Sequence, residues 1–350
     1  MPHYDAFLLV SFGGPEAPDE VMPFLENVTR GRGIPRERLA AVAEHYYAAG
    51  GISPINQQCR GLAAAIGKDF ASAGLDLPVY WGNRNWAPYL TATVADMAAA
   101  GVRRAVGFVT SAYGSYSSCR QYLDDIAAAC AEVGPGAPRI DKLRHFFNHP
   151  GFIEPLAEQA RAAVESLPAE VRPDVPLVFT AHSVPEAMAA SSGPPPGGLY
   201  PAQLAEASRL VAERVGTAHP WRLVYQSRSG PPAQPWLGPD VRDHLEDLAR
   251  SGAPAAVLVP VGFVSDHMEV IHDLDVEAAQ TAERVGLRLA RAATPGTHPR
   301  FVSMITELVR ERVDGQMAGA MLGPLQPPRD ICRNDCCPAA AVSTRPGRAG

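Results

Sequence analysis

The sequence predicts an α/β protein with two domains, each built on a parallel β-sheet flanked by helices, and with one cleft between them. Three observations lead to this prediction. Short apolar runs of strand length alternate with longer segments of helical period along most of the 350 residues. The runs fall into two groups divided near residue 150, and polar residues gather directly after the runs. Such alternation is typical of parallel sheets that are covered on both faces.

Each element follows from its local pattern. The predicted strands are 6–11, 78–82, 105–110, 176–181, 223–226 and 255–261. The predicted helices include 56–73, 118–131, 152–167, 202–215, 239–251 and 301–313. The first domain is therefore expected at 1–150 and the second at 151–298. A final helix within 300–318 is expected to pack back on the first domain, and 323–350 to form a cysteine-containing tail.

Polar groups follow the predicted strands in both halves of the chain. The turn at Gly13 and Gly14 follows the first strand, and His182 follows the fourth. Asp266 and His267 follow the sixth. In open parallel sheets, ligands bind beyond the carboxyl ends of the strands. Two such sets of groups therefore predict one ligand cleft between the domains.

Composition excludes several classes of protein. The net charge of −6 leaves no basic footprint for nucleic acid. The start lacks the basic region of a signal peptide, and no run approaches the roughly 18 apolar residues of a membrane span. No G-x-G-x-x-G follows the first strand, which argues against a nicotinamide enzyme. We expect a cytoplasmic protein without membrane attachment, and a monomer is compatible with the sequence. Its six cysteines are expected to be free thiols or metal ligands.

An unusual acidic pattern follows the sixth strand. Glu269, Asp273 and Glu277 recur at intervals of four, so a helix would place them on one face. Like charges at this spacing repel by a few tenths of a kcal/mol per pair. Two ordinary explanations stay open: a capping box formed by Asp266 and Glu269, and a solvated acidic face. A site that attracts cations is the functional alternative.

At these residues the chain resembles the ferrochelatases, which insert Fe(II) into a porphyrin, and within them the bacterial, actinobacterial-type coproporphyrin ferrochelatases. The matching stretches keep the family's order. They are LLVSFGGPE (8–16), HYYAAGGISPIN (45–56), SAYGSYSSC (111–119), FTAHSVPE (179–186), YQSRSGPPAQPWLGPDV (225–241) and PVGFVSDHMEVIHDLDVEA (260–278). The resemblance implies two Rossmann-like domains around a porphyrin cleft, and the lyase activity of a heme-biosynthesis enzyme.

The resemblance also implies roles for the residues of the second half. His182 would be the central catalytic group, as proton acceptor or metal ligand, with Glu269 as its acidic partner and second ligand. Asp273 and Glu277 would form an acidic path for metal or protons. His267 would orient Glu269; a purely structural histidine is the alternative.

On the porphyrin side, the resemblance implies contacts from the first half of the chain. Arg32, Trp86 and Tyr113 are weaker candidates for contacts with the porphyrin. Phe12 has no hydroxyl and cannot ligate the metal as a tyrosine would. Surface arginines, capping serines and core tyrosines are the ordinary explanation for the set. The predicted porphyrin-binding residues are Phe12, Arg30, Tyr46, Ser53, Ser117 and Tyr122.

The substrate expectation rests on the segment TRGRGIPRERLAAVAEHYY, which is charged where membrane-associated relatives carry an apolar lip. A polar cleft mouth suits a porphyrin with four carboxylates, so coproporphyrin III, giving coproheme III, is expected over protoporphyrin IX. A non-catalytic tetrapyrrole or metal carrier is the alternative from another class. Partners would be the porphyrin and, transiently, other enzymes of heme synthesis.

Three cysteines, Cys332, Cys336 and Cys337, lie within six residues near the end of the chain. Thiolates bind zinc or iron–sulfur clusters. By resemblance, a [2Fe–2S] cluster is the leading interpretation. The family's internal ligand position, near Pro155, is not cysteine, so the fourth ligand would be Cys130, Cys119 or Cys59. Zinc, or thiols without a ligand, remain open.

Overall fold

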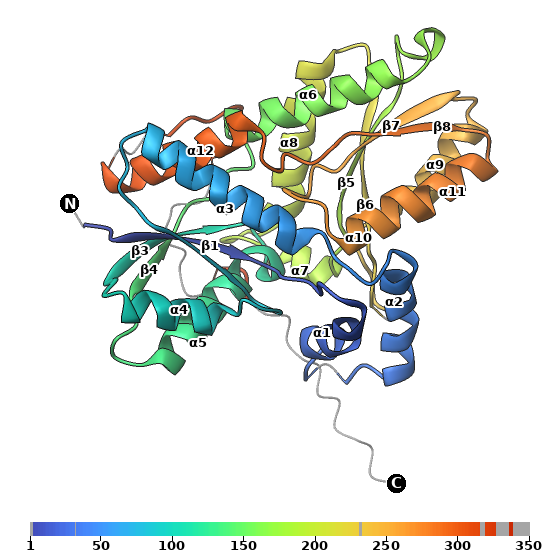
Figure 1. Ribbon diagram of the computed structural model, residues 1–350. Coiled ribbons are helices and arrows are strands. Elements are labelled where there is room, and N and C mark those ends of the chain that lie inside the picture. Colours follow the sequence, from blue (N-terminus) through green and yellow to red (C-terminus); the bar gives the residue numbers. More distant parts are fainter. Residues whose placement is uncertain (1–2, 32, 231–232, 316–318, 327–335, 339–350) are drawn as a thin grey trace.

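The computed structural model describes residues 3–31, 33–230, 233–315, 319–326 and 336–338. Within them the chain forms two four-stranded sheets in which every strand pairing is parallel. Helices cover both faces of each sheet (Figure 1). The predicted α/β class and the two parallel sheets are confirmed.

The first sheet has the strand order β2-β1-β3-β4. Its strands are β1 (Ala6–Ser11), β2 (Val79–Asn83), β3 (Arg104–Val109) and β4 (Arg139–Lys142). Alternate residues of β1 face opposite sides, as the strand period requires. Leu8 packs towards α4 (Leu90–Ala99) and α5 (Gln121–Val133), whereas Phe7 packs towards α3 (Ile55–Ser72).

The second sheet repeats this topology, with the order β6-β5-β7-β8. Its strands are β5 (Leu177–His182), β6 (Trp221–Gln226), β7 (Ala255–Val259) and β8 (Arg288–Arg291). Helices α6 (Pro150–Ser166) and α8 (Leu199–Val215) pack on one face. On the other lie α9 (Val241–Arg250), α10 (Met268–Val270), a π-helix (Ile271–Ala278) and α11 (Ala279–Arg284).

Shorter and separate elements complete the fold. Helices α1 (Val21–Val28) and α2 (Arg36–Ala48) form a small apolar cluster of their own beside the sheets. The remaining elements are α7 (Glu186–Ala190), a second π-helical turn (Tyr116–Arg120) and 3₁₀ turns at Pro18–Glu20 and Ala169–Val171. None of the described helices is long and apolar enough to cross a membrane.

The last helix, α12 (Pro299–Val313), packs against both α3 and α6 (Figure 1). The sequence predicted that it packs back on the first domain, and the contact with α6 of the second half was not predicted. Its buried residues Phe301 and Ile305 belong to one apolar core that also contains Phe7 of the first sheet and Phe179 of the second. Because this core is continuous, α12 ties the two sheets together. The division near residue 150 therefore separates the two sheets in the topology. That the two halves fold as separate domains remains a proposal.

The strands β4 and β8 were missed by the sequence prediction, for a shared reason. Their sequences, RIDK and RLAR, are short and polar, and each strand lies at an edge of its sheet. Edge strands are half solvated and therefore lack the apolar signature of central strands. The π-helix at Ile271–Ala278 was also not predicted, since a wider helical turn leaves no distinct periodic signal over eight residues.

Candidate active site

His182 is the last residue of β5, so its side chain emerges at the carboxyl edge of the second sheet. Nδ1 donates a hydrogen bond to the carbonyl oxygen of Ser183 at 2.5 Å, and Tyr200 donates its hydroxyl to the carbonyl oxygen of His182 at 2.9 Å. A proton on Nδ1 leaves the Nε2 lone pair available, and the ring is held in one orientation. The side chain keeps 35% of its surface exposed, so a ligand can reach it.

Glu269 reaches His182 from α10, the short helix beyond β7. Its Oε2 lies 3.4 Å from Nε2 of His182. Burial alone would raise the pKa of Glu269, but the hydrogen bond and charge of His182 outweigh it and lower this pKa to about 2. Burial likewise opposes the charge on His182, yet the Glu269 carboxylate raises the pKa of the imidazole overall. The two groups form one coupled unit that stabilises an imidazolium beside a carboxylate.

The predicted acidic ladder is helical, and part of it lies on the π-helix. Burial is the main cause that raises the pKa of Asp273 to about 6, with Glu269 and Glu277 adding to it. Ser227 donates its hydroxyl to Oδ2 of Asp273, and the amide of Gln226 donates to the same atom at 3.3 Å. Asp273 is therefore half-buried, hydrogen-bonded and able to exchange a proton near neutral pH.

Ser227 adopts a left-handed backbone conformation, with φ of 62°, which non-glycine residues rarely occupy. Such conformations persist where the surroundings enforce them, often at functional sites. The bond to Asp273 is one such contact. Further out, Oε2 of Glu277 lies 3.3 Å from Arg242, and its Oε1 lies 3.7 Å from Nε2 of His272.

The capping-box explanation for Glu269 is wrong. The N-cap of α10 is His267, and no side-chain cap hydrogen bond is made there. Asp266 instead pairs with Arg291 at 3.1 Å. His267 packs edge-to-face on Phe263, with ring centroids 5.2 Å apart, and its burial lowers the pKa of its imidazole. Its role in orienting Glu269 stays a proposal.

A cavity of about 370 Å³ lies between the two halves of the chain, within the range of roughly 300–1,000 Å³ usual for small-molecule sites. Glu269, Asp273 and Glu277 line it together with His267, and His182 adjoins it through Glu269. From the first half, the predicted residues Phe12, Tyr46 and Ser53 line the same cavity.

Other predicted porphyrin contacts lie away from this cavity lining. Arg30 is exposed beyond α1, and the Ser117 hydroxyl contacts the sulfur of Met188 at 3.8 Å. Tyr122 is buried beneath the guanidinium of Arg84, 4.4 Å from the ring centroid. Arg32 lies outside the described residues. These positions make Ser117 and Tyr122 part of the packing next to the site.

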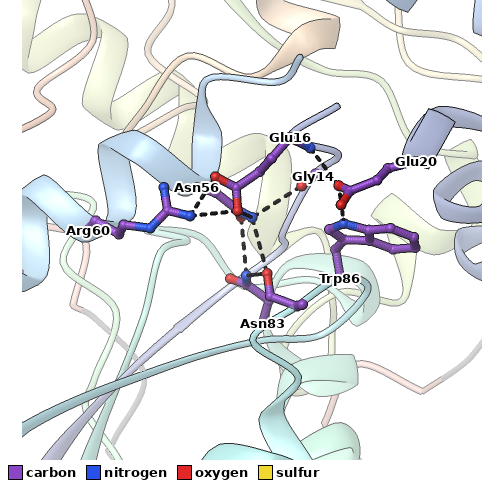
Figure 2. Close-up of polar contacts among 8 residues, drawn as sticks. Gly14, Glu16, Glu20, Asn56, Arg60, Asn83 and Trp86 are labelled. Carbon is purple, nitrogen blue, oxygen red and sulfur yellow. Dashed lines mark hydrogen bonds and ion pairs between the residues drawn. The ribbon is translucent and has the colours of Figure 1, made fainter. Parts of the chain in front are cut away.

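The two weaker aromatic candidates also have structural partners. The Tyr113 hydroxyl donates to the carbonyl oxygen of Val261 at 2.6 Å, and this buried contact joins the two halves of the chain. Trp86 donates from Nε1 to Glu20 at 2.7 Å (Figure 2). Its ring packs on Phe24. Tyr113 is thus a core residue.

Beneath the Gly13–Gly14 turn lies a polar network that the sequence prediction missed (Figure 2). Its centre is Asn56, whose amide donates to the Gly14 carbonyl at 3.2 Å and to Glu16 at 3.1 Å. Asn83, at the end of β2, donates to Oδ1 of Asn56 at 3.1 Å. An added Cβ at Gly14 would lie 2.8 Å from Ser53. The turn therefore needs glycine for close packing, and Asn56 holds it in place.

The cavity also contains residues to which the sequence prediction assigned no function. Arg228 and Ser229 follow β6, and their position beyond the end of a predicted strand was the signal that placed them at the cleft. The main additions to the lining are His45, Gln226, Ser227, Arg242 and His272.

Near the end of the chain, the described residues 336–338 lie against the body of the protein. Cys336 and Cys337 are buried, with their sulfur atoms 3.8 Å apart. The Gly193 amide donates to Sγ of Cys337 at 3.0 Å. Burial is the main cause that raises the pKa of Cys337, and the nearby Cys119 thiol adds to it. Cys332 lies outside the described residues.

The chain is similar to known proteins over nearly its whole length. A family model described as Ferrochelatase matches residues 4–313. A Streptomyces coelicolor protein named "Coproporphyrin III ferrochelatase" is 53% identical, and the match covers 99% of this chain and 96% of the relative. A Nocardia farcinica protein of the same name is 55% identical, covering 99% of each chain. A Rhodopirellula baltica protein named "Ferrochelatase" is 51% identical, covering 96% of this chain and 94% of the relative.

Among solved structures, SirB from Bacillus subtilis with Fe³⁺ superposes with a TM-score of 0.53. The match covers 90% of this chain and 98% of SirB at 11% sequence identity. At this identity the likeness concerns the fold alone, and it agrees with two parallel sheets flanked by helices.

Proposed function

The chain belongs to the ferrochelatase family, and from this premise we propose that it inserts Fe(II) into coproporphyrin III, with His182 and Glu269 as the reacting pair. The observation that supports the proposal most is the 3.4 Å contact between Nε2 of His182 and Oε2 of Glu269 beside the cavity between the sheets. Protoporphyrin IX, giving protoheme, is the alternative substrate.

Metallation replaces two pyrrole N–H protons by one Fe(II) ion, so two protons leave for each ion that enters. In the proposed reaction, Nε2 of His182 accepts the two pyrrole protons one after the other, and the Glu269 carboxylate stabilises the imidazolium that forms each time. Asp273, whose pKa is about 6, is suited to take each proton onward towards solvent. Imidazole and carboxylate are also ligands for Fe(II), so His182 as a metal ligand is the alternative to His182 as the base.

The polar and cationic residues at the cleft mouth suit a porphyrin with four carboxylates. Helix α2 presents Arg36 and Arg38 there among exposed polar residues, and Arg38 reaches the carbonyl oxygen of Ser229 at 2.7 Å. Tyr46 and Ser53 offer hydroxyls inside the cavity. Propionates need such cationic and hydroxyl partners. Arg30 and Ser117 belong to the same proposal as residues that a bound macrocycle would contact outside the present cavity, whereas Tyr122 lies buried beneath Arg84.

Anaerobic turnover of the purified protein tests the function directly. Fe(II) is supplied with coproporphyrin III or with protoporphyrin IX, and the metallated product is followed by absorbance. We expect a higher kcat/KM for coproporphyrin III. A higher value for protoporphyrin IX would overturn the substrate assignment, and porphyrin binding without turnover of either would favour a carrier. A cytoplasmic monomer with transient contacts to heme-pathway enzymes stays a prediction.

We also propose that the terminal cysteines hold a [2Fe–2S] cluster, with Cys119 as the internal ligand. The fit rests on the buried Cys336 and Cys337 thiols, on the Gly193 amide that donates to Cys337, and on the nearness of Cys119. Backbone N–H groups that donate to sulfur are among the features that tune such clusters. A cluster here would serve stability or redox sensing, since metal insertion requires no electron transfer.

The absorption spectrum of anaerobically purified protein tests the cluster. We expect charge-transfer bands in the visible region that disappear in Cys337→Ser and Cys119→Ser but persist in Cys59→Ser. Iron and sulfide analysis gives the stoichiometry. Protein that contains zinc, or neither metal nor sulfide, would contradict this assignment and leave the porphyrin chemistry untouched.

A further inference from the structure

Two buried tyrosines hold the ends of the two strands that lead to the reacting pair. The Tyr200 hydroxyl, on α8, donates to the carbonyl oxygen of His182 at 2.9 Å. The Tyr113 hydroxyl, from the first half of the chain, donates at 2.6 Å to the carbonyl oxygen of Val261, two residues beyond the end of β7. The first contact fixes the residue that carries the imidazole. The second fixes the start of the segment that leads to Glu269.

The carbonyl group of His182 points to a side of β5 that β7 no longer covers. Along a strand, the backbone groups of every second residue point to the same neighbouring strand. Thr180 faces the β7 side, because its carbonyl oxygen accepts from the Gly262 amide at 3.0 Å. His182 lies two residues further and faces the same side, where the paired part of β7 has already ended. Tyr200 therefore supplies the donor that a longer β7 would have given.

The two tyrosines also pack on each other. Their rings meet edge-to-face, with centroids 6.3 Å apart and planes at 88°. Burial raises the pKa of both hydroxyls, so Tyr113 and Tyr200 stay neutral donors. The backbone amide of Tyr200 donates to the hydroxyl of the fully buried Ser192 at 2.9 Å, which anchors the start of α8. The tyrosine pair is thus one packed unit that spans the ends of β5 and β7.

The segment between Val261 and Glu269 transmits the position of the strand end. An added Cβ at Gly262 would lie 2.7 Å from the Cα of Ala181, so the backbones beyond β7 and in β5 touch there. Because interiors are close-packed, a shift at Val261 carries along the buried segment to Glu269. The side chains that hold this segment in the core are those of Phe263, Val264 and Met268.

We propose that Tyr113 and Tyr200 are positioning residues that set the separation between Nε2 of His182 and Oε2 of Glu269. This inference deepens the proposed function and rests on it, because the separation matters for rate only if the two groups act together. Their 3.4 Å distance is already long for a hydrogen bond, so a small further displacement weakens the contact. A misplacement of about 1 Å can cost about 100-fold in rate. Neither tyrosine lines the cavity, so both act through the pair rather than on the porphyrin.

Removal of each hydroxyl in the full-length protein tests the inference. Tyr200→Phe and Tyr113→Phe keep the packed rings, and each should lower kcat for metallation by about tenfold with the KM for coproporphyrin III unchanged. In a Glu269→Ala background there is no separation left to maintain, so each substitution should lower the residual kcat by less than about twofold. Tyr225→Phe, which removes another buried hydroxyl from the neighbouring strand β6, is the matched control and should keep the wild-type kcat.

Wild-type kcat in both phenylalanine variants would overturn the inference, and so would losses that are equally large with and without Glu269, in protein that thermal unfolding shows to be folded. NMR of ¹⁵N-histidine-labelled protein follows the geometry without turnover. The Nε2 resonance of His182, assigned by its loss in His182→Ala, should move in both variants towards its position in Glu269→Ala. If the wild type turns over no porphyrin, the proposed function fails, while this resonance still decides whether the tyrosines position the pair.

Discussion

Nε2 of His182 lies 3.4 Å from Oε2 of Glu269, although the two residues follow different strands of the second sheet. Strand β5 ends in the histidine, and the short helix α10, which follows the neighbouring strand β7, carries the carboxylate. Parallel pairing brings both to one edge of the sheet. The contact joins two separate sequence motifs into the single unit that we propose as the proton acceptor.

Removing either member of this pair should abolish most of the activity. We expect His182→Ala to lower kcat by about 10²–10⁴-fold, the usual contribution of a positioned general base, with a smaller loss for Glu269→Gln. Porphyrin binding, followed by fluorescence quenching, should be retained. His219→Ala, at the opposite end of the second sheet, is the control. Wild-type kcat in His182→Ala would exclude the proposed base.

The pair should also set the acid limb of the pH–rate profile. Glu269 raises the pKa of His182, so the wild-type rate should rise with pH through a midpoint above the ordinary imidazole value of about 6.5. In Glu269→Gln, the carboxylate charge that raises the pKa of His182 is lost, whereas the burial that lowers this pKa remains. The residual activity should therefore have its acid limb at lower pH. A midpoint that is unchanged by this substitution would show that another group controls the rate.

The contribution of Asp273 to the stability of the folded protein should fall as pH rises, which is the reverse of the usual effect of a carboxylate. Its pKa is about 6 in the folded protein and 3.8 in the reference state, so the folded state binds the proton more tightly. Stability from this group is present below pH 4 and is lost as pH rises through 6. Asp273→Asn should therefore gain stability over the wild type, on the order of 1–2 kcal/mol at pH 7.5 and little at pH 4. Urea unfolding at both pH values measures this, and an equal effect at both would refute the shift.

Tyr46 should contribute to porphyrin affinity through its hydroxyl. It lines the cavity, and burial is the main cause that raises its pKa, so it stays a neutral donor. Tyr46→Phe should raise the KM for coproporphyrin III by about tenfold, the equivalent of one lost hydrogen bond of about 1.4 kcal/mol. Tyr47→Phe removes a hydroxyl from the neighbouring, exposed tyrosine and should have little effect.

Asn56 should contribute to folding rather than to chemistry. Its amide donates to Gly14, Glu16 and Ala87, and its oxygen accepts from Asn83. Asn56→Ala leaves several buried groups unpaired and should cost about 2–4 kcal/mol of unfolding free energy. The exposed neighbour Gln57→Ala should cost less than about 0.5 kcal/mol. Chemical denaturation compares the two, and equal losses would argue against the network.

The sequence by itself determined the α/β class, the central strands and the placement of His182 and Glu269 beyond them. Those features depend on apolar periodicity and on short motifs, which are local properties of the chain. The polar edge strands β4 and β8 carry no such pattern, and neither does the π-helix around Asp273.

Tertiary structure decided which side chains meet. The stack of His45 on His272, the bond from Ser227 to Asp273, and the packing of α12 on both α3 and α6 join segments distant in the chain. It also separated Tyr122, buried under Arg84, from Tyr46 in the cavity, although the sequence placed them in one group. Such contacts depend on how helices and sheets pack in three dimensions, and residue spacing along the chain holds no record of that packing.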